Sequence, residues 1–435
     1  MMNIYFIAFG CKVSQYETEC MKEHFIKEGF AVSSDEENAD VFIINTCTVT
    51  AVSDKKCRQT LRRIRKNHPG SVIAVTGCFP QAFPDKISDI KEADIITGTK
   101  NRSEITELVK KALNEKKQLV EIEPFMNHEA MEISSCSSFT GKTRAFVKIQ
   151  DGCNQFCSYC IIPYARGRNR SKPLDELKSE IRTLAENGHR EIVLVGINLA
   201  FYGSEYGLTL ADAVEACCSI KGVERVRLSS LEPEKITDDE LVRFSQCSQF
   251  CPHFHLSLQS GCDKTLKAMN RRYDSSEYYD LVCRIRKIFP ECSLTTDVMT
   301  GFPGETDEDF RQSYEFVRKT AFSQIHVFPY SRRSGTPADR FPDQIPDSVK
   351  HQRAAKMSEL GRELHRNFLK SHIGRTVPVL FEKETSPEFH QGHAPDYTYV
   401  KIPAAPDDKS FRKSVLNVRI TDCDSDCCYG VIADR

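Results

Sequence analysis

The alternation of short apolar runs with longer helical patterns constrains the fold of this 435-residue chain more than any other feature. Apolar runs that continue at nearly every position are typical of parallel strands buried on both faces. We therefore expect residues 1–117 to form an α/β domain with a covered parallel sheet. The expected strands are Ile4–Phe9, Val41–Asn45, Val72–Thr76 and Asp94–Thr97, and the expected helices are Gln15–Lys27, Val52–Lys66 and Ser103–Lys111.

Residues 118–138 are interpreted as a linker, and residues 139–369 repeat the alternation on a larger scale. Six strand–helix units in this segment suit a barrel of the TIM type or part of one. Helices are expected at Pro173–Asn187, with Pro173 in the first turn, at Thr306–Lys319 and at 348–372. The expected strands are Ala145–Ile149, Glu191–Val195, Arg225–Leu228, Phe254–Leu258, Ser293–Val298 and Gln324–Phe328.

The last segment, residues 370–435, is rich in turn residues and predicts short strands only. These strands are expected at Val377–Lys383, Tyr397–Ile402, Val415–Ile420 and Cys428–Ile432. A small all-β barrel is the expected architecture.

Composition limits the class of protein. No apolar run approaches the length of about 18 residues that a membrane span needs, so no membrane association is expected. The N-terminus has no basic lead, and a secretory signal is therefore not expected either. The 60 Lys and Arg residues balance 61 Asp and Glu residues, so nucleic acid could be bound only by local basic patches.

The chain contains 19 cysteines, an odd number. A chain of this kind is expected in the reducing cytoplasm, where disulfides are rare. Metal or iron–sulfur ligation is therefore the leading explanation for a subset of them.

The sharpest motif is DGCNQFCSYC, which spaces Cys153, Cys157 and Cys160 as C-x3-C-x2-C just after the first strand of the barrel-like segment. Thiolates are the ligands of iron–sulfur clusters, and three of them leave one iron of a 4Fe–4S cluster open to another ligand. A closed zinc site would need a fourth ligand, for which Cys136 in the linker is a candidate.

A second set of cysteines is spread over the first segment. Cys11 in FGCK, Cys47 in NTCT and Cys78 in TGCF each follow an expected strand directly. Ligands bind outside the carboxyl ends of parallel strands, and neighbouring strands lie only about 4.8 Å apart. Three such thiolates can therefore converge on one cluster; the alternative is three unrelated buried cysteines.

The sequence around both cysteine sets resembles that of the radical S-adenosylmethionine (SAM) methylthiotransferase family, and the resemblance extends over essentially the whole chain. The similar segments include GCKVSQYETE, INTCTVTAVSDKKCRQTLRRIRK, CIIPYARGRNRS, HLSLQSG, TTDVMTGFPGET and HVFPYSRRSGTPA. The resemblance implies a flavodoxin-like N-terminal domain at 1–117, a radical SAM core at 139–369 and an OB-like TRAM barrel at 370–435. The segments IIPYARGR and HVFPYSRRSGTPA are most like the MtaB-type subgroup.

The resemblance also implies a reaction. Cys153, Cys157 and Cys160 would hold the 4Fe–4S cluster that cleaves SAM, and the resulting radical would take hydrogen from C2 of the adenine. Sulfur would come from the region of a second 4Fe–4S cluster on Cys11, Cys47 and Cys78, and a second SAM would supply the methyl group. The expected substrate is N6-threonylcarbamoyladenosine at position 37, in the tRNA anticodon stem-loop. The expected electron donor is a flavodoxin or ferredoxin; the resemblance does not predict an oligomeric state.

Three alternatives stay open at this point. A sister methylthiotransferase would act on N6-isopentenyladenosine in tRNA or on a ribosomal-protein aspartate. A protein of another class would be a non-catalytic iron–sulfur protein that binds RNA or serves in redox reactions. The third is a zinc-bound module that binds tRNA.

Residues at later strand ends are candidates for contact with SAM. Gly196 and Asn198 follow the strand at Glu191–Val195, where radical SAM enzymes place a loop near the cofactor. Gln259 and Asp297 lie at later strand ends, and Gly301 with Gly304 could allow a close backbone approach. Each could equally be a turn or capping residue.

The segment 55–66, KKCRQTLRRIRK, holds seven cations and no acid, which favours phosphate contact over a solvated helix face. The TRAM segment is acidic overall, so we expect the helix at 55–66 and the loop at 166–170 to contribute more phosphate affinity than the barrel. The candidate tRNA contacts are Lys55, Arg58, Arg62, Arg65, Arg166, Arg168, Arg170, Arg332 and Arg333, with Lys409, Arg412 and Lys413 in the barrel.

Overall fold

The computed structural model describes residues 1–48, 51–115, 117–126, 129–139, 141–383, 386–404 and 410–433. The chain divides into two compact units. Unit 1 combines Met1–Ser137 with Phe146–Lys172 and Ser331–Arg340, and unit 2 combines Ser138–Ala145 with Pro173–Tyr330 and Phe341–Arg435. Each unit is described by itself.

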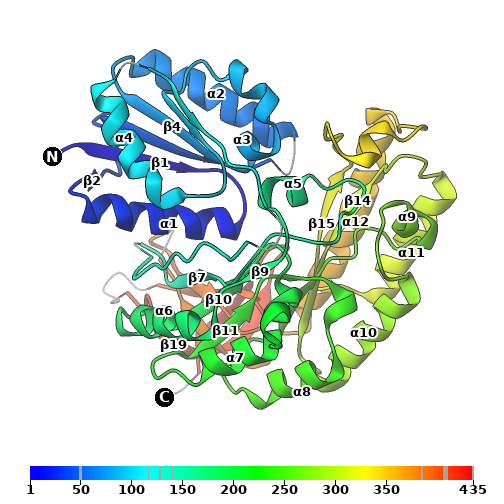
Figure 1. The fold of residues 1–435 in the computed structure, drawn as a ribbon. Helices are drawn as coiled ribbons and strands as arrows, with labels where there is room; N and C mark the ends of the chain where they lie inside the picture. Colours follow the sequence, from blue (N-terminus) through cyan, green and yellow to red (C-terminus); the bar gives the residue numbers. More distant parts are fainter. Residues whose placement is uncertain are drawn as a thin grey trace. The chain divides into compact units, whose positions relative to one another are not determined.

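Unit 1 is built on a six-stranded, all-parallel sheet with the order β2-β1-β3-β4-β5-β6 (Figure 1). The order of the first five strands is that of flavodoxin-like folds, which confirms the expected fold class. The strands are β1 (Asn3–Ala8), β2 (Ala31–Val32), β3 (Val41–Thr46), β4 (Val72–Gly77), β5 (Ile95–Thr97) and β6 (Leu119–Glu121).

Helices cover both faces of this sheet, because β3 and β4 are apolar toward both sides. One core cluster joins the sheet to α2 (Ala51–Asn67) and α3 (Cys78–Ala82) through Leu61, Ile64 and Phe79. The other joins it to α1 (Lys12–Lys27) and α4 (Ile105–Asn114) through Met21, Phe25 and Val109.

A second part of the chain returns to unit 1 after the expected linker. It contains the end of β7 (Arg144–Lys148), the short antiparallel pair β8 (Gln150–Asp151) and β9 (Arg170–Ser171), and α5 (Ile162–Arg166). Ile161 belongs to the same core cluster as α2 and α3. The loop that carries the three spaced cysteines therefore lies in the same compact unit as the N-terminal sheet.

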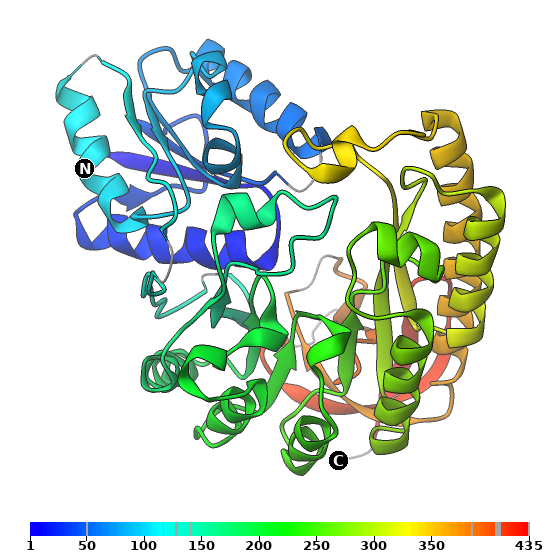
Figure 2. The same cartoon turned by 45° about the vertical axis from the view of Figure 1, so that its right-hand side comes forward.

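Unit 2 contains parallel strands with helices around them, as Figure 2 shows. β10 pairs with β11, and β12, β13, β14 and β15 pair in that order. This arrangement confirms a partial (β/α) barrel. The strands are β10 (Glu191–Val195), β11 (Arg225–Leu228), β12 (Ser230–Leu231), β13 (His253–Leu256), β14 (Ser293–Thr300) and β15 (Gln324–Pro329). The helices are α6 (Leu174–Glu186), α7 (Leu210–Cys218), α8 (Asp238–Gln246), α9 (Asp263–Ala268), α10 (Ser275–Ile288), α11 (Asp307–Thr320) and α12 (Asp347–Lys370).

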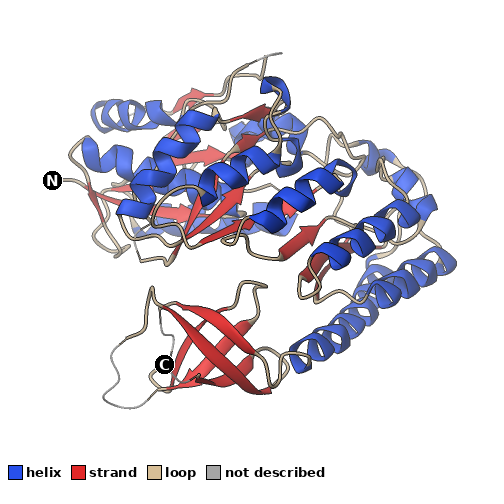
Figure 3. Ribbon diagram, turned by 90° about the horizontal axis from the view of Figure 1, so that it is seen from below, coloured by secondary structure: helices blue, strands red, loops and turns tan. Residues whose placement is uncertain are grey.

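The C-terminal strands close into a barrel with the order β16-β17-β18-β20-β19 (Figure 3). The strands are β16 (Thr376–Phe381), β17 (Phe389–His393), β18 (Tyr399–Pro403), β19 (Val415–Cys423) and β20 (Cys428–Ile432). Val379, Phe381, Val400 and Val418 fill its interior, together with Leu369 from the end of α12. The small all-β barrel expected for a TRAM domain is thus present.

Sequence and structure differ in a few elements. The short strands β2, β6 and β17 were not expected, because they are brief or carry polar residues such as His390 and Gln391. Pro173 precedes α6 as its N-cap with φ −55° and ψ 142°, rather than standing in the first turn. Within the described part of the chain, none of the helices has the length and apolar composition that a membrane crossing requires.

Candidate active site

The three strand-end cysteines of the N-terminal segment follow neighbouring strands. The Phe9 amide donates to the carbonyl of Asn45 at 2.8 Å, which places the end of β1 beside the end of β3. Thr46 at the end of β3 faces Gly77 at the end of β4. Cys11, Cys47 and Cys78 therefore leave three adjacent strands at the same edge of the sheet, at the point where the strand order reverses.

Two glycines make room for this arrangement. Gly10 has a φ of 110°, and a Cβ there would lie 2.6 Å from Cβ and 2.8 Å from Sγ of Cys47. Gly77 has a φ of 105°, and its Cβ would lie 2.6 Å from the carbonyl oxygen of Thr46. Both backbones thus adopt a conformation that favours glycine, and both approach their neighbours too closely for a side chain.

The thiols of Cys11, Cys47 and Cys78 differ in their exposure to solvent. Cys47 and Cys78 are buried, whereas Cys11 is exposed. Burial raises the pKa of the Cys78 thiol to about 11; the Arg166 guanidinium works against this shift, and the nearby Cys47 and Cys11 add to it. Cys78 is therefore a thiol at neutral pH, and ligation of a metal by this side chain would release its proton.

The second cysteine set lies in a tight loop between β8 and α5. The Cys153 amide donates to the Gly167 carbonyl at 3.0 Å, the Gln155 amide donates to Sγ of Cys153 at 3.4 Å, and the Cys160 amide donates to the Cys157 carbonyl at 2.9 Å. Phe156 has a φ of 50°, which is uncommon for a residue other than glycine. Backbone hydrogen bonds therefore define the path of the loop that carries the three thiols.

Both sets provide three thiols, the donor type that iron–sulfur clusters use. Among the described residues, no three His, Cys, Asp or Glu side chains are grouped as they would be around one metal ion. Three thiols around a 4Fe–4S cluster bind different irons and need not converge on one point. Thiols at three adjacent strand ends, spaced by glycines, fit such a cluster, and so does the C-x3-C-x2-C loop.

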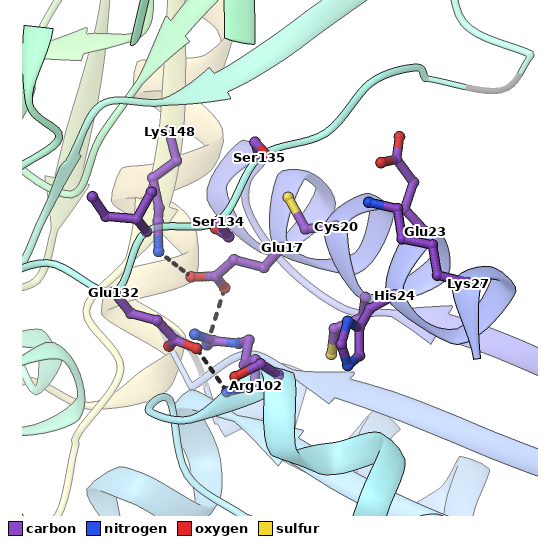
Figure 4. A pocket seen from close by; sticks show the side chains of 13 residues that line it. Glu17, Cys20, Glu23, His24, Lys27, Arg102, Glu132, Ser134, Ser135 and Lys148 are labelled. Atoms are coloured by element: carbon purple, nitrogen blue, oxygen red, sulfur yellow. Dashed lines mark hydrogen bonds and ion pairs between the residues drawn. The ribbon is translucent and has the colours of Figure 1, made fainter. Parts of the chain in front are cut away.

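A cluster of buried charged side chains lies in unit 1 beside these cysteines. Glu17 of α1 is 2% exposed and accepts a hydrogen bond from Nζ of Lys148 at 2.9 Å. Arg102 lies 3.1 Å from its other oxygen, as Figure 4 shows. Burial alone would raise the pKa of Glu17, but the charges of Arg102, Arg166 and Lys148 lower it well below its usual range. Glu17 is therefore ionised in the folded protein.

Arg166 links this charged cluster to Cys78. Its side chain is completely buried, and its guanidinium donates to both oxygens of Glu17, with 3.0 Å between Nη2 and Oε2. Its Nε donates to Sγ of Cys78 at 3.2 Å. One arginine that follows the cluster loop by only a few residues thus contacts a cysteine of the other set.

A cavity of about 200 Å³ lies beside Glu17, Arg102 and Lys148, between α1 and residues 132–135 (Figure 4). Cys20, Glu23, His24 and Lys27 line it from successive turns of α1. Because its walls carry both charge signs, the cavity favours no single class of ligand.

The expected SAM contacts lie in unit 2. Asn198 and Gln259 are buried at strand ends, and Gln259 has a φ of 65°. Asp297 of β14 lies 3.3 Å from Nε2 of His255. Gly196 follows β10 and is half-buried. These residues stay predictions as cofactor contacts.

The two later glycines have different surroundings. A Cβ at Gly301, where φ is 70°, would lie 2.3 Å from Cγ of Lys350 on α12. Packing against the helix therefore explains this glycine without a ligand. Gly304 has a φ of 77° and open space around its Cα.

Three of the expected phosphate contacts are corrected by the structure. Arg166 is completely buried on Glu17 and Cys78. Arg170 is 8% exposed and stacks over the ring of Phe125. Arg333 is 5% exposed and donates to Asp54 at 2.8 Å. Their guanidinium groups serve buried ion pairs, so they are not available to tRNA phosphates.

The other candidate cations reach the surface to different degrees. Lys55, Arg58 and Arg62 are exposed on α2, opposite the buried Cys57, Leu61 and Ile64, as the helical spacing predicted. Arg65 is half-buried against Asp94, whereas Arg168 and Arg332 are exposed. Arg412 and Lys413 are half-buried in the barrel, and Lys409 lies outside the described residues.

Glu17 and Lys148 were missed by the sequence reasoning. A signal for Glu17 exists: it lies on the same helical face as Val13, Tyr16 and Met21, where an isolated charge is unexpected. Such a position calls for a buried partner. The identity of the partner could not be read from the sequence, because Lys148 is 131 residues away.

Comparison with known proteins identifies the family. The uncharacterized protein family UPF0004 matches residues 3–98, and the radical SAM superfamily matches residues 147–317. A Bacillus subtilis protein named threonylcarbamoyladenosine tRNA methylthiotransferase MtaB is 37% identical over 393 residues, which cover 89% of this chain and 87% of the relative. The chain belongs to the radical SAM methylthiotransferase family. It is therefore a transferase whose cofactors are SAM and 4Fe–4S clusters.

One further relative and one solved structure are also similar to this methylthiotransferase. A Clostridium botulinum tRNA-2-methylthio-N(6)-dimethylallyladenosine synthase is 36% identical over 385 residues, covering 86% of this chain and 84% of the relative. The radical SAM methyltransferase TsrM from Kitasatospora setae, solved with cobalamin and a 4Fe–4S cluster, has a TM-score of 0.57 at 13% identity. It covers 78% of this chain and 74% of its own, and it supports the fold of the methylthiotransferase.

Proposed function

We propose that this methylthiotransferase inserts a methylthio group at C2 of N6-threonylcarbamoyladenosine next to the tRNA anticodon. The observation that carries the proposal is the presence of two sets of three thiols in one compact unit. Relatives named for this substrate match at 35–38% identity over 88–91% of the chain. An unactivated aromatic C–H bond resists acid–base chemistry, so the reaction needs radical chemistry that only a cofactor supplies.

Each cysteine set has a separate role in the proposal. Cys153, Cys157 and Cys160 hold the cluster that binds SAM, and Cys11, Cys47 and Cys78 hold the auxiliary cluster. When bound, the first cluster with SAM supplies the radical, and the second supplies the place where sulfur is delivered. The tight loop and the three strand ends orient the thiols before the clusters bind, which avoids an ordering cost during the reaction.

The remaining parts of the chain hold the substrates. Gly196, Asn198, Gln259 and Asp297 contact SAM, and the exposed cations of α2 contact the anticodon stem-loop of tRNA. Residues 1–117, 139–369 and 370–435 act as auxiliary-cluster domain, radical SAM core and TRAM domain. The segment 118–138, whose first residues form β6 of the N-terminal sheet, connects the first two. A small redox protein such as a flavodoxin or ferredoxin supplies the electron, and the enzyme works in the cytoplasm, where tRNA is modified.

The second candidate substrate is N6-isopentenyladenosine in tRNA. The observation that favours it is the 36% identity to a dimethylallyladenosine-modifying relative, which is almost the same as the identity to the threonylcarbamoyladenosine-modifying relative. Overall identity therefore does not decide between the two bases, and the modified nucleoside itself has to be measured.

The test compares modified nucleosides in tRNA from a strain with the gene and a strain without it, by mass spectrometry. The proposal expects loss of the methylthio form of threonylcarbamoyladenosine, accumulation of the unmethylthiolated form, and an unchanged isopentenyl series. Complementation with the Cys157→Ala variant should fail to restore the methylthio form. Loss of the methylthio isopentenyl nucleoside instead would assign the second substrate. Unchanged nucleosides, with no SAM cleavage by reconstituted protein, would contradict both.

A further inference from the structure

The contact between Arg166 and Cys78 joins the two cysteine sets. Arg166 lies on α5, six residues after Cys160, and its Nε donates to Sγ of Cys78 at 3.2 Å. Hydrogen bonds from N–H groups to the sulfurs and nearby net charge are two of the factors that set the reduction potential of an iron–sulfur cluster. The geometry therefore places a cationic donor directly on one proposed ligand of the auxiliary cluster.

Glu17 fixes the position of this guanidinium. Both Nη atoms of Arg166 donate to its carboxylate, which leaves Nε as the group that faces Cys78. Two parallel hydrogen bonds of this kind define the plane of the guanidinium. A lysine could carry the same charge but could not contact Glu17 and Cys78 with this geometry.

The buried network around Arg166 has an excess of positive charge. Its members with side chains less than one tenth exposed are the cations Arg102, Lys148, Arg166 and Arg170 and the anions Glu17 and Asp151. Burial of uncompensated charge is costly. A cluster held by three thiolates carries a net negative charge, so its binding at Cys11, Cys47 and Cys78 would compensate the excess.

We propose that Arg166, held by Glu17, is a positioning residue that raises the reduction potential of the auxiliary cluster and holds its Cys78 ligand. The proposal rests on the assignment of Cys11, Cys47 and Cys78 as cluster ligands. It couples the two cysteine sets structurally, because the residue on the auxiliary ligand belongs to the segment that forms the SAM-binding cluster loop. Removal of the Arg166 charge should lower the potential, whereas removal of the Glu17 charge should raise it.

The experiment measures the midpoint potential of the auxiliary cluster alone. The full-length chain carrying Cys153→Ala, Cys157→Ala and Cys160→Ala retains only this cluster, and its potential is followed by electron paramagnetic resonance during a redox titration. In this background we expect Arg166→Gln to shift the potential to more negative values, Arg166→Lys to shift it less, and Glu17→Gln to shift it to more positive values. A purely structural role would not give opposite shifts for the two partners.

A matched control is Arg227→Lys. Arg227 is 1% exposed and donates to Glu191 at 2.8 Å, so the variant disturbs a buried ion pair in unit 2. Its auxiliary potential should stay unchanged. If the Arg166 variants lose their iron, the potential of the auxiliary cluster is measured in the Glu17→Gln and Asp151→Asn variants instead. An unshifted midpoint potential in both of these variants overturns the proposal. An unchanged potential in an iron-loaded Arg166→Gln variant overturns it directly. The titration uses no tRNA, so its result is independent of the substrate assignment.

Discussion

Oε1 of Glu17 and Nζ of Lys148 lie 2.9 Å apart, and both side chains are almost completely buried although 131 residues separate them. This ion pair joins α1, which starts next to Cys11, to the strand that leads into the loop of Cys153. It therefore ties together the chain segments that carry the two cysteine sets, and its integrity should matter for folding and for cluster binding.

Replacement of Glu17 by leucine should destabilise unit 1. The substitution leaves Lys148, Arg102 and Arg166 without their shared carboxylate, and breaking a buried ion pair in this way costs about 3–5 kcal/mol. Urea unfolding followed by circular dichroism measures the loss as an earlier first transition. Glu28→Gln, which removes an exposed pair with Lys110, is the control and should leave that transition nearly unchanged. An equal effect of both variants would contradict the argument.

A methyl group at Gly10 should disturb the auxiliary cysteines. The Cβ of Gly10→Ala would collide with Cys47, so we expect the iron content to fall from about eight per chain toward about four, the content of a single cluster. Gly29→Ala is the matched control, because Gly29 also has a positive φ, 87°, but no atom within 4 Å of its Cβ position. The control should lose some stability and keep its iron. Full iron loading of Gly10→Ala would contradict the assignment of Cys47.

The exposed cations of α2 should carry part of the salt dependence of tRNA binding. Neutralising Lys55, Arg58 and Arg62 to glutamine removes up to three phosphate contacts, so the slope of log K against log salt should fall by about 2–3. Arg311→Gln with Arg318→Gln, on α11, removes exposed cations that are paired with Glu308 and Glu315 and should leave the slope unchanged. An unaltered slope in the α2 variant would remove this helix from the tRNA-binding surface.

The barrel should be less stable at alkaline pH because of His372. Burial works to lower the pKa of His372, but its hydrogen bond to Asp396, 2.6 Å long, and the charge of Asp396 outweigh burial and raise the pKa. A raised folded pKa stabilises the fold fully below the unfolded value of about 6.5, and this contribution is lost as pH rises through the folded value. The melting temperature should therefore decline above neutral pH in the wild type.

The control for this pH dependence is His372→Gln, which removes the titrating group. The variant should melt lower near pH 6 and should lack the decline attributed to the pair. Parallel melting curves of wild type and variant across pH 6 to pH 9 would contradict the assignment.

Much of the fold followed from periodicity. The strands that lead to Cys11, Cys47 and Cys78 are apolar at most positions, and β3 and β4 are buried along their whole length. The strand β17, by contrast, contains the buried polar residues His390 and Gln391 and shows no apolar alternation.

The candidate site also contains some features that the sequence predicts and others that only the structure shows. The positions of the cysteines in the fold could be predicted, because three of them directly follow expected strands and three share one short loop. The buried environment of Arg166 could not be predicted, because the local sequence makes it one of three arginines in a basic loop. Only the structure shows that it is completely buried between Glu17 and Cys78, whereas Arg168 is exposed.

The assignment of two 4Fe–4S clusters is tested most directly by the iron and sulfide content of anaerobically purified protein and its two triple-cysteine variants. We expect about eight irons per chain in the wild type, from two 4Fe–4S clusters. We expect about four in the variant lacking Cys11, Cys47 and Cys78, and about four in the variant lacking Cys153, Cys157 and Cys160. About four irons in the wild type, with no further loss when Cys11, Cys47 and Cys78 are replaced by alanine, would contradict the assignment.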